Sequence, residues 1–215
     1  MSDDIFEQTI ATYRRVEGAE GFVAKELRHQ GGSRDVTSYS MLEGVVLDGK
    51  RVLDIGCGFG RDVAELRRRG AEAYGCDVSP ALLAMAQRDV GPYFVECNVR
   101  QGDVLPFGGG FDLIWCCALL VHIPRPELRD VMKRMWNGLR EGGSAIVISK
   151  QGEGQSVARN LGEDLPRVMV MYRPEELVDV WTAWGGEIEV FKPDLSVTPY
   201  GDSLFGVRLR KRETA

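Results

Sequence analysis

The stretch Asp54-Ile55-Gly56-Cys57-Gly58-Phe59-Gly60 decides the fold. It follows a short β-branched run, Arg51–Ile55, and precedes a helical pattern over Arg61–Arg69. Glycines concentrate where a chain turns sharply from a strand into a helix and a ligand must approach the backbone. A dinucleotide-binding loop has glycine at its first, third and sixth positions, whereas here Arg61 holds the sixth position and glycine the fifth. The loop therefore favours another small ligand over a dinucleotide, without excluding the latter.

Strands and helices alternate along most of the chain. Continuous apolar strands separated by helices predict a parallel sheet covered on both faces, and the last two strands follow each other directly as an antiparallel hairpin. The predicted fold class is α/β: a Rossmann-like, doubly wound, mostly parallel seven-stranded sheet with an antiparallel C-terminal hairpin and an N-terminal helical cover. The predicted strands span Arg51–Ile55, Ala71–Cys76, Tyr93–Val99, Phe111–Cys116, Ala145–Ser149, Glu187–Phe191 and Leu204–Leu209; the helices between and after them include Glu127–Leu139, which Gly142-Gly143 is expected to end, and Pro174–Trp184.

The length of 215 residues predicts one domain. Residues 1–49 are expected to form a helical cover that belongs to this domain, with helices over Ile5–Val16 and around Val36–Val46. Residues 50–211 form the predicted core. Within it, the segment from about 151 to 173 is expected to be variable and to recognise the substrate; its glycines and mixed charges suggest a mobile loop or short helices.

The glycine loop resembles motif I of the class I S-adenosylmethionine (SAM)-dependent methyltransferases, in which an acidic residue and three alternating glycines end the first strand. The resemblance implies that SAM is the cofactor. It also implies that the backbone of Gly56, Cys57, Gly58 and Gly60 faces the SAM carboxylate and that Asp54 attracts its ammonium group.

Further segments extend the resemblance over Lys50–Lys150. Asp77 ends the second strand, where an acidic residue accepts hydrogen bonds from ribose hydroxyls in NAD and SAM sites alike, and Val78 follows it. Asp103-Val104 follows the third strand, at the position where the family commonly meets the adenine amino group; a turn or cap role for Asp103 stays open. Cys117, at the end of the fourth strand, is also expected beside SAM.

Candidates for the transfer step lie near the carboxyl ends of the fourth and fifth strands. His122 could act as a general base, because a histidine near its usual pKa suits an alcohol, phenol or ammonium nucleophile. The alternative is a structural role in its His-Ile-Pro context. Substrate contacts are expected from Tyr13, Arg14, Lys150 and Tyr172, for which solvated or structural roles remain open.

Composition narrows the partners. A net charge of −5 and a pI of about 5.2 disfavour nucleic acid. The longest apolar run, Leu113–Val121, is too short to span a bilayer, and the acidic N-terminus lacks the start of a signal peptide, so a cytoplasmic location is expected without membrane association. The 5 cysteines include no C-x-x-C pair, which predicts no metal. The chain is expected to act as a monomer or a homodimer.

These observations favour an enzyme that methylates oxygen or nitrogen of a small metabolite. The chain carries no Asn/Asp-Pro-Pro-Tyr motif, which family members that methylate adenine, cytosine or glutamine carry, and its short cover fits a small acceptor. Three alternatives stay open: a methyltransferase of protein or another macromolecule, a non-catalytic SAM-binding module, and a nicotinamide-dependent oxidoreductase.

Overall fold

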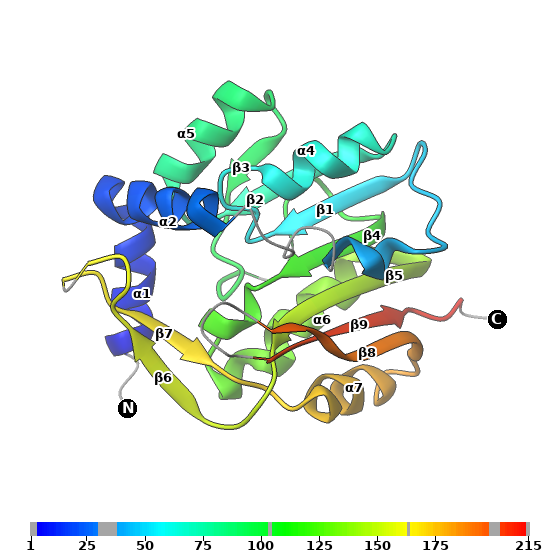
Figure 1. The fold of residues 1–215 in the computed structure, drawn as a ribbon. Coiled ribbons are helices and arrows are strands. Elements are labelled where there is room, and N and C mark those ends of the chain that lie inside the picture. The colour runs from blue at the N-terminus through cyan, green and yellow to red at the C-terminus, as the bar shows by residue number, and fades with distance from the viewer. Residues whose placement is uncertain (1–3, 30–37, 103–104, 163, 198–202, 214–215) are drawn as a thin grey trace.

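The computed structural model describes residues 4–29, 38–102, 105–162, 164–197 and 203–213. Within them, a seven-stranded sheet has the order β3-β2-β1-β4-β5-β9-β8. The first five strands run parallel and β9 runs antiparallel to β5 and β8, as predicted (Figure 1). The strands are β1 (Arg51–Ile55), β2 (Glu72–Asp77), β3 (Phe94–Glu96), β4 (Phe111–Cys117), β5 (Leu139–Lys150), β8 (Glu187–Val197) and β9 (Ser203–Arg210).

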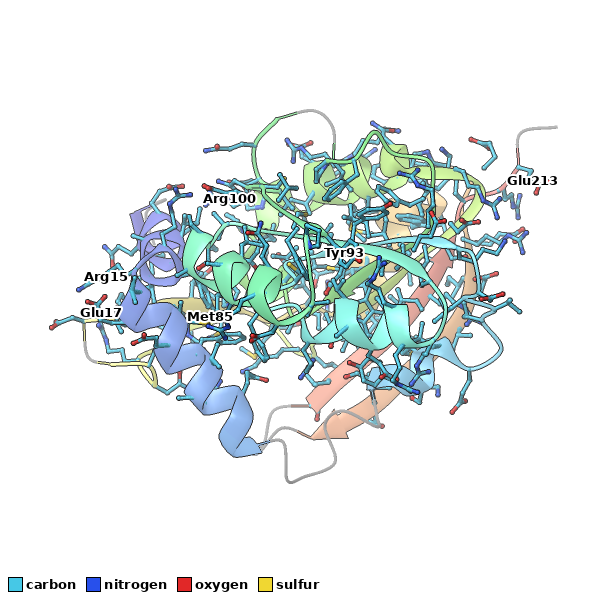
Figure 2. All side chains as sticks on the ribbon, turned by 90° about the horizontal axis from the view of Figure 1, so that it is seen from above. Arg15, Glu17, Met85, Tyr93, Arg100 and Glu213 are labelled. Carbon is cyan, nitrogen blue, oxygen red and sulfur yellow. The ribbon has the colours of Figure 1, made fainter. Side chains whose placement is uncertain are left out.

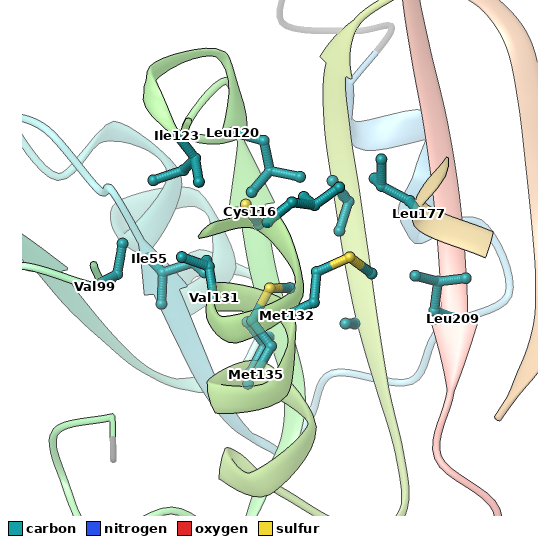
Figure 3. Close-up of a cluster of buried hydrophobic side chains, with 14 of the residues drawn as sticks. Ile55, Val99, Cys116, Leu120, Ile123, Val131, Met132, Met135, Leu177 and Leu209 are labelled. Carbon is teal, nitrogen blue, oxygen red and sulfur yellow. The ribbon is translucent and has the colours of Figure 1, made fainter. Parts of the chain in front are cut away.

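Helices cover both faces of the sheet, and a separate apolar cluster fills the space under each layer. On one face α4 (Arg61–Arg68) and α5 (Pro80–Asp89) pack on β1, β2 and β3. On the other face α6 (Leu128–Gly138) and α7 (Pro174–Thr182) pack on β4, β5, β8 and β9. Figure 3 shows this second cluster, in which Val131, Met132 and Met135 of α6 face Cys116 of β4. Their spacing of three and four residues places them on one face of the helix.

The turns that follow β1 and β2 have simple local causes. Gly60, with φ of +84°, begins α4; an added Cβ would lie 2.8 Å from Phe94. Ser79 caps α5 by accepting the backbone N–H of Leu82, and Pro80 occupies the first turn. Both helices therefore begin directly at the carboxyl ends of β1 and β2.

The N-terminal cover differs in part from its prediction. The first helix is confirmed as α1 (Asp4–Arg14), but a second helix, α2 (Val16–His29), was not predicted. Glycines inside α2 weaken its helical pattern. One of them, Gly18, has a packing reason, because an added Cβ would lie 1.9 Å from the carbonyl oxygen of Thr12. Arg15 and Glu17, at the corner between α1 and α2, lie at the opposite end of the molecule from Glu213 (Figure 2).

The helix predicted around Val36–Val46 ends earlier than expected. Residues 30–37 lie outside the described part; Ser38 and Tyr39 are helical, and the 3-10 turn η1 (Ser40–Leu42) follows them. Gly44, with φ of +74°, follows, which is incompatible with a continuing helix.

The segment predicted as a mobile loop or short helices is a hairpin. Strands β6 (Gln155–Ala158) and β7 (Arg167–Val170) pair antiparallel beside α1 (Figure 1). The backbone N–H of Val168 donates to Thr9 Oγ1 at 2.9 Å, and Thr12 Oγ1 donates to the Pro166 carbonyl at 2.8 Å. These contacts join segments more than 150 residues apart. Local sequence patterns therefore could not show the hairpin.

The boundary between α6 and β5 also differs from the prediction. The helix ends at Gly138 and β5 begins at Leu139, so Gly142-Gly143 lies inside the strand instead of ending the helix. The pairing between β4 and β5 shifts register between Phe111 and Leu113. Gly143 fits this irregularity, because an added Cβ would lie 2.8 Å from the Phe111 carbonyl oxygen. Among the described residues, no helix is both long and apolar enough to cross a membrane.

Candidate active site

A cavity of about 190 Å³ lies where the carboxyl ends of β1, β2 and β4 meet α1 and α2. Ligands bind at this edge of open α/β sheets. Two sets of polar side chains contribute to its walls. The loop group consists of Asp54, Arg61, Asp62 and Asp77, and the cover group consists of Tyr13, Lys25, His122, Lys150 and Arg167.

The glycine loop shapes one wall of the cavity but does not offer the amides that the resemblance implied. Gly56 and Cys57 donate their N–H groups to the Cys76 carbonyl at 2.8 and 3.1 Å, and Gly58 donates to Asp77 Oδ2 at 3.0 Å. Gly60 donates to the Cys57 carbonyl at 3.0 Å. These N–H groups are therefore committed inside the protein. The positive φ values of the glycines, +74°, +54° and +84°, fold the loop. Gly56 and Gly58 line the cavity, whereas Gly60, also expected beside the cofactor, does not and packs towards Phe94.

Asp54 holds a buried carboxylate that is incompletely paired. It is 2% exposed, and its Oδ2 has no hydrogen-bond partner among the described residues. Burial, and then the negative charge of Asp62, raise the pKa of Asp54 well above its usual range. A ligand cation placed beside Asp54 would supply the missing compensation.

Asp62, by contrast, is fully engaged. It accepts hydrogen bonds from Tyr39 Oη at 2.7 Å and Trp115 Nε1 at 2.9 Å, and pairs with Arg61 Nε at 2.7 Å. Burial acts to raise the pKa of Asp62, but Arg61 and the hydrogen bonds outweigh it and hold the pKa below its usual value. Arg61 also lies 3.9 Å from Glu26 of α2, which links the loop group to the cover.

Asp77 is positioned by backbone amides. Its two oxygens accept N–H groups from Gly58 at 3.0 Å and Ser79 at 2.9 Å, while burial raises its pKa despite these bonds. An ionised carboxylate has about four acceptor positions. Asp77 therefore keeps capacity for ligand hydroxyl groups in the cavity that it lines.

The cover group contains a continuous hydrogen-bond chain. Arg167 of β7 donates through Nη1 to Tyr13 Oη at 2.6 Å. His122, in the 3-10 turn η2 (Leu120–His122), has Nδ1 2.7 Å from the Val168 carbonyl. Because a carbonyl only accepts, Nδ1 carries the proton, and Nε2 accepts the Tyr13 hydroxyl at 3.0 Å.

These neighbours keep His122 neutral. Burial, then the positive charge of Arg167, lower the pKa of His122 to about 3, with Lys150 and Lys25 acting in the same direction. Burial raises the pKa of Tyr13, although Arg167 opposes it. At neutral pH the imidazole is uncharged and its lone pair is already hydrogen-bonded, so this arrangement lacks the free histidine base that the sequence suggested.

Comparison with known proteins fits this geometry. Residues 52–143 match a family described as a methyltransferase domain. The magnesium-protoporphyrin O-methyltransferase of Synechocystis sp. is 32% identical over 171 residues, which cover 76% of this chain and 74% of that protein. This chain belongs to the class I SAM-dependent methyltransferase family.

Solved structures of the family share the fold. A SAM-dependent methyltransferase from Methanosarcina mazei matches with a TM-score of 0.71 at 21% identity, over 82% of this chain and 99% of that one. The magnesium protoporphyrin IX methyltransferase of Synechocystis, crystallised with SAM bound, matches with a TM-score of 0.64 at 20% identity, over 88% of this chain and 84% of that one.

The residues of this methyltransferase fit SAM. The unpartnered Oδ2 of Asp54 can accept an ammonium group, Asp77 can accept ribose hydroxyls, and Arg61 lines the cavity as a cation for a carboxylate. When bound, SAM supplies a methyl group on a positively charged sulfonium. The protein's part is to bind and orient both reactants.

The structure gathers most, but not all, of the site residues predicted from the sequence. Tyr13, Lys150 and His122 line the cavity, as do Val78 and Cys117. Asp103 and Val104 lie outside the described residues.

Two predicted substrate contacts lie elsewhere. Arg14 does not line the cavity; it ion-pairs with Glu96 and donates to the Val78 carbonyl. Tyr172 is buried and donates to the Ile123 carbonyl at 2.7 Å, also away from the cavity lining. Both roles are structural in this fold.

Sequence reasoning missed Arg61, Asp62 and Arg167. The Arg61-Asp62 pair directly follows the glycine loop, so its position was a usable signal. No sequence signal marked Arg167, because only the long-range docking of β7 on α1 brings it to the cavity.

Proposed function

We propose that this methyltransferase transfers the methyl group of SAM to a small molecule bound in the cavity between the glycine loop and the N-terminal cover. The observation that carries the proposal is the cavity itself, in which Tyr13, His122 and Arg167 present a buried polar network beside the loop group. The name of the Synechocystis relative, a magnesium-protoporphyrin O-methyltransferase, supports a small acceptor.

We assign Asp54 to the SAM ammonium, Asp77 to the ribose, and Gly56 and Gly58 to a close backbone approach. The chain's contribution to transfer is alignment, because holding two reactants in line replaces much of the entropic cost of their encounter. The cover helices and the β6–β7 hairpin form part of the cavity wall. Tyr13 and His122 fix the shape of the acceptor side through their mutual hydrogen bond.

The test is the destination of the methyl group. The purified protein is incubated with [methyl-³H]SAM and a cell extract separated into fractions below 3 kDa and above 10 kDa. The expected result is label in the low-mass fraction that Asp77→Asn reduces. Label in the macromolecular fraction alone would reject the small-molecule acceptor, and binding of SAM with transfer to neither fraction would favour a non-catalytic module.

A further inference from the structure

Arg167 is a buried cation without a buried anion. It is 2% exposed and lines the cavity. Its partners are neutral: Nη1 donates to Tyr13 Oη and Nη2 to Asn160 Oδ1, each at 2.6 Å. Its Nε is buried and has no hydrogen-bond partner, and no acidic side chain in the described part of the chain pairs with it.

A buried guanidinium that no described acidic side chain neutralises is suited to bind an anion. Burying a charge is costly unless it is paired and hydrogen-bonded. The planar guanidinium presents five N–H donors that match carboxylate geometry, often through two parallel hydrogen bonds. Because Arg167 lines the cavity, an anion bound there would neutralise its charge.

The surrounding charges favour the same kind of ligand. Lys25 and Lys150 line the cavity with Arg167, and all three act on His122 as positive charges. Among the acidic residues of the lining, Glu26 of α2 lies on the side of the cover, 3.9 Å from Arg61. The cover group thus has net positive charge, which attracts an anionic acceptor and repels a protonated amine.

The chemistry of the cover group fits an acceptor that is already ionised. His122 Nε2 accepts the Tyr13 hydroxyl and is not available to remove a proton. Tyr13 stays protonated, because burial raises its pKa. An alcohol or a protonated amine would require a base here, whereas a carboxylate requires none.

We infer that the acceptor is a small carboxylic acid whose carboxylate is bound by Arg167 and is itself methylated. A lone pair of the carboxylate oxygen forms the new bond to the methyl carbon while the carbon–sulfur bond breaks and its electron pair goes to sulfur. The products are a methyl ester and S-adenosylhomocysteine (SAH), and no proton is transferred. This inference rests on the proposed small-molecule methyl transfer.

The first experiment measures anion binding to the SAH-saturated protein. Benzoate, phenylacetate, hexanoate and succinate are titrated by calorimetry beside their primary amides at equal ionic strength. At least one acid is expected to bind about 10- to 100-fold more tightly than its amide. Arg167→Gln should abolish this preference, and Arg159→Gln, an equal change of charge at an exposed position of the same hairpin, should retain it.

If Arg167→Gln does not fold, the comparison of each acid with its amide on the wild-type protein still tests the inference. Arg167→Lys is a second variant, which keeps the positive charge but loses the Nε donor. Equal binding of every acid and its amide, or a preference retained without Arg167, would overturn the inference.

The second experiment identifies the product. Label transferred from [methyl-³H]SAM to the low-mass fraction should be released as volatile methanol by mild base, because methyl esters hydrolyse and methyl ethers and amines do not. Base-stable low-mass label would overturn the inference and leave the proposed function intact. Label confined to protein would reject the proposed function itself.

Discussion

Tyr13→Phe removes a hydroxyl that joins two buried polar groups. The Tyr13 hydroxyl accepts from the charged Arg167 at 2.6 Å and donates to neutral His122 at 3.0 Å. The ring is 9% exposed and packs edge-on against His122 and Phe22, so these apolar contacts survive the change. The substitution therefore tests the hydrogen bonds alone.

The expected cost follows from the two bonds. A hydrogen bond to a charged group contributes about 1.5–3 kcal/mol and a neutral one about 0.5–1.5 kcal/mol, so their joint loss costs about 2–4.5 kcal/mol. Tyr13 lines the cavity, and water entering there can pair again with Arg167 and His122. We therefore expect a loss of about 2 kcal/mol, which lowers the melting temperature of a 215-residue domain by about 4–8 °C.

Tyr172→Phe is the matched control. Tyr172 is also buried, but its hydroxyl makes one neutral bond, to the Ile123 carbonyl at 2.7 Å, and it lies outside the cavity lining. Its loss should cost about 1 kcal/mol. Urea unfolding of both variants without ligand measures the difference through the transition midpoints at constant slope. If Tyr13→Phe lowers the free energy of unfolding no more than Tyr172→Phe does, the Tyr13 hydroxyl does not form the proposed pair of stabilising hydrogen bonds to Arg167 and His122.

Three further changes test other parts of the site. Asp77→Asn should weaken SAH binding at least about tenfold in calorimetry, because the amide loses acceptor capacity, whereas Asp89→Asn at an exposed ion pair should not. The pKa of His122 lies near 3 in the folded state, below its unfolded value, so the folded state binds fewer protons and stability falls as the pH drops from about 6.5 towards 3. The imidazole NMR signal of His122 should therefore not titrate between pH 8 and 5. A titration midpoint near 6.5 would contradict the burial argument. Gly18→Ala should destabilise the protein despite the better helix propensity of alanine, because the new Cβ would lie 1.9 Å from the Thr12 carbonyl oxygen. Gly21→Ala should be close to neutral, because its Cβ would lie 3.4 Å from the nearest atom. Equal thermal stability of the two variants would contradict the close packing of α1 and α2.

The cavity residues that we assign to the cofactor were predictable because they lie close together in the sequence. The glycines, Asp54 and Asp77 belong to strand ends and turns whose sequence and structure coincide within a few residues. Parallel strands then bring these ends to one edge of the sheet. The same reasoning explains why the mostly parallel seven-stranded sheet and its C-terminal hairpin matched the prediction.

Arg167, unlike Tyr13, His122 and Lys150, was not predictable because its position at the cavity depends on long-range docking. Arg167 reaches Tyr13 only because β7 packs on α1, 154 residues away along the chain. Neither four-residue strand of the hairpin carries a pattern that identifies its partner. Arg14 and Tyr172 were predicted to contact substrate because they are close in sequence to cavity residues. Their side chains instead bind Glu96 and the Ile123 carbonyl, respectively.

The two groups of charges suit a reaction that removes charge. Asp54 and Asp77 lie on the side assigned to the cationic cofactor, and Arg167, Lys25 and Lys150 on the side assigned to the anionic acceptor. Transfer between a sulfonium and a carboxylate gives two neutral products, a change that a cavity of low dielectric favours over water. The same cations then discriminate between substrate and product, because a methyl ester offers Arg167 no charge. The ester should therefore bind the SAH complex more weakly than its parent acid by about the same 10- to 100-fold that separates acid from amide. An ester that competes as well as the acid would show that Arg167 does not recognise the negative charge.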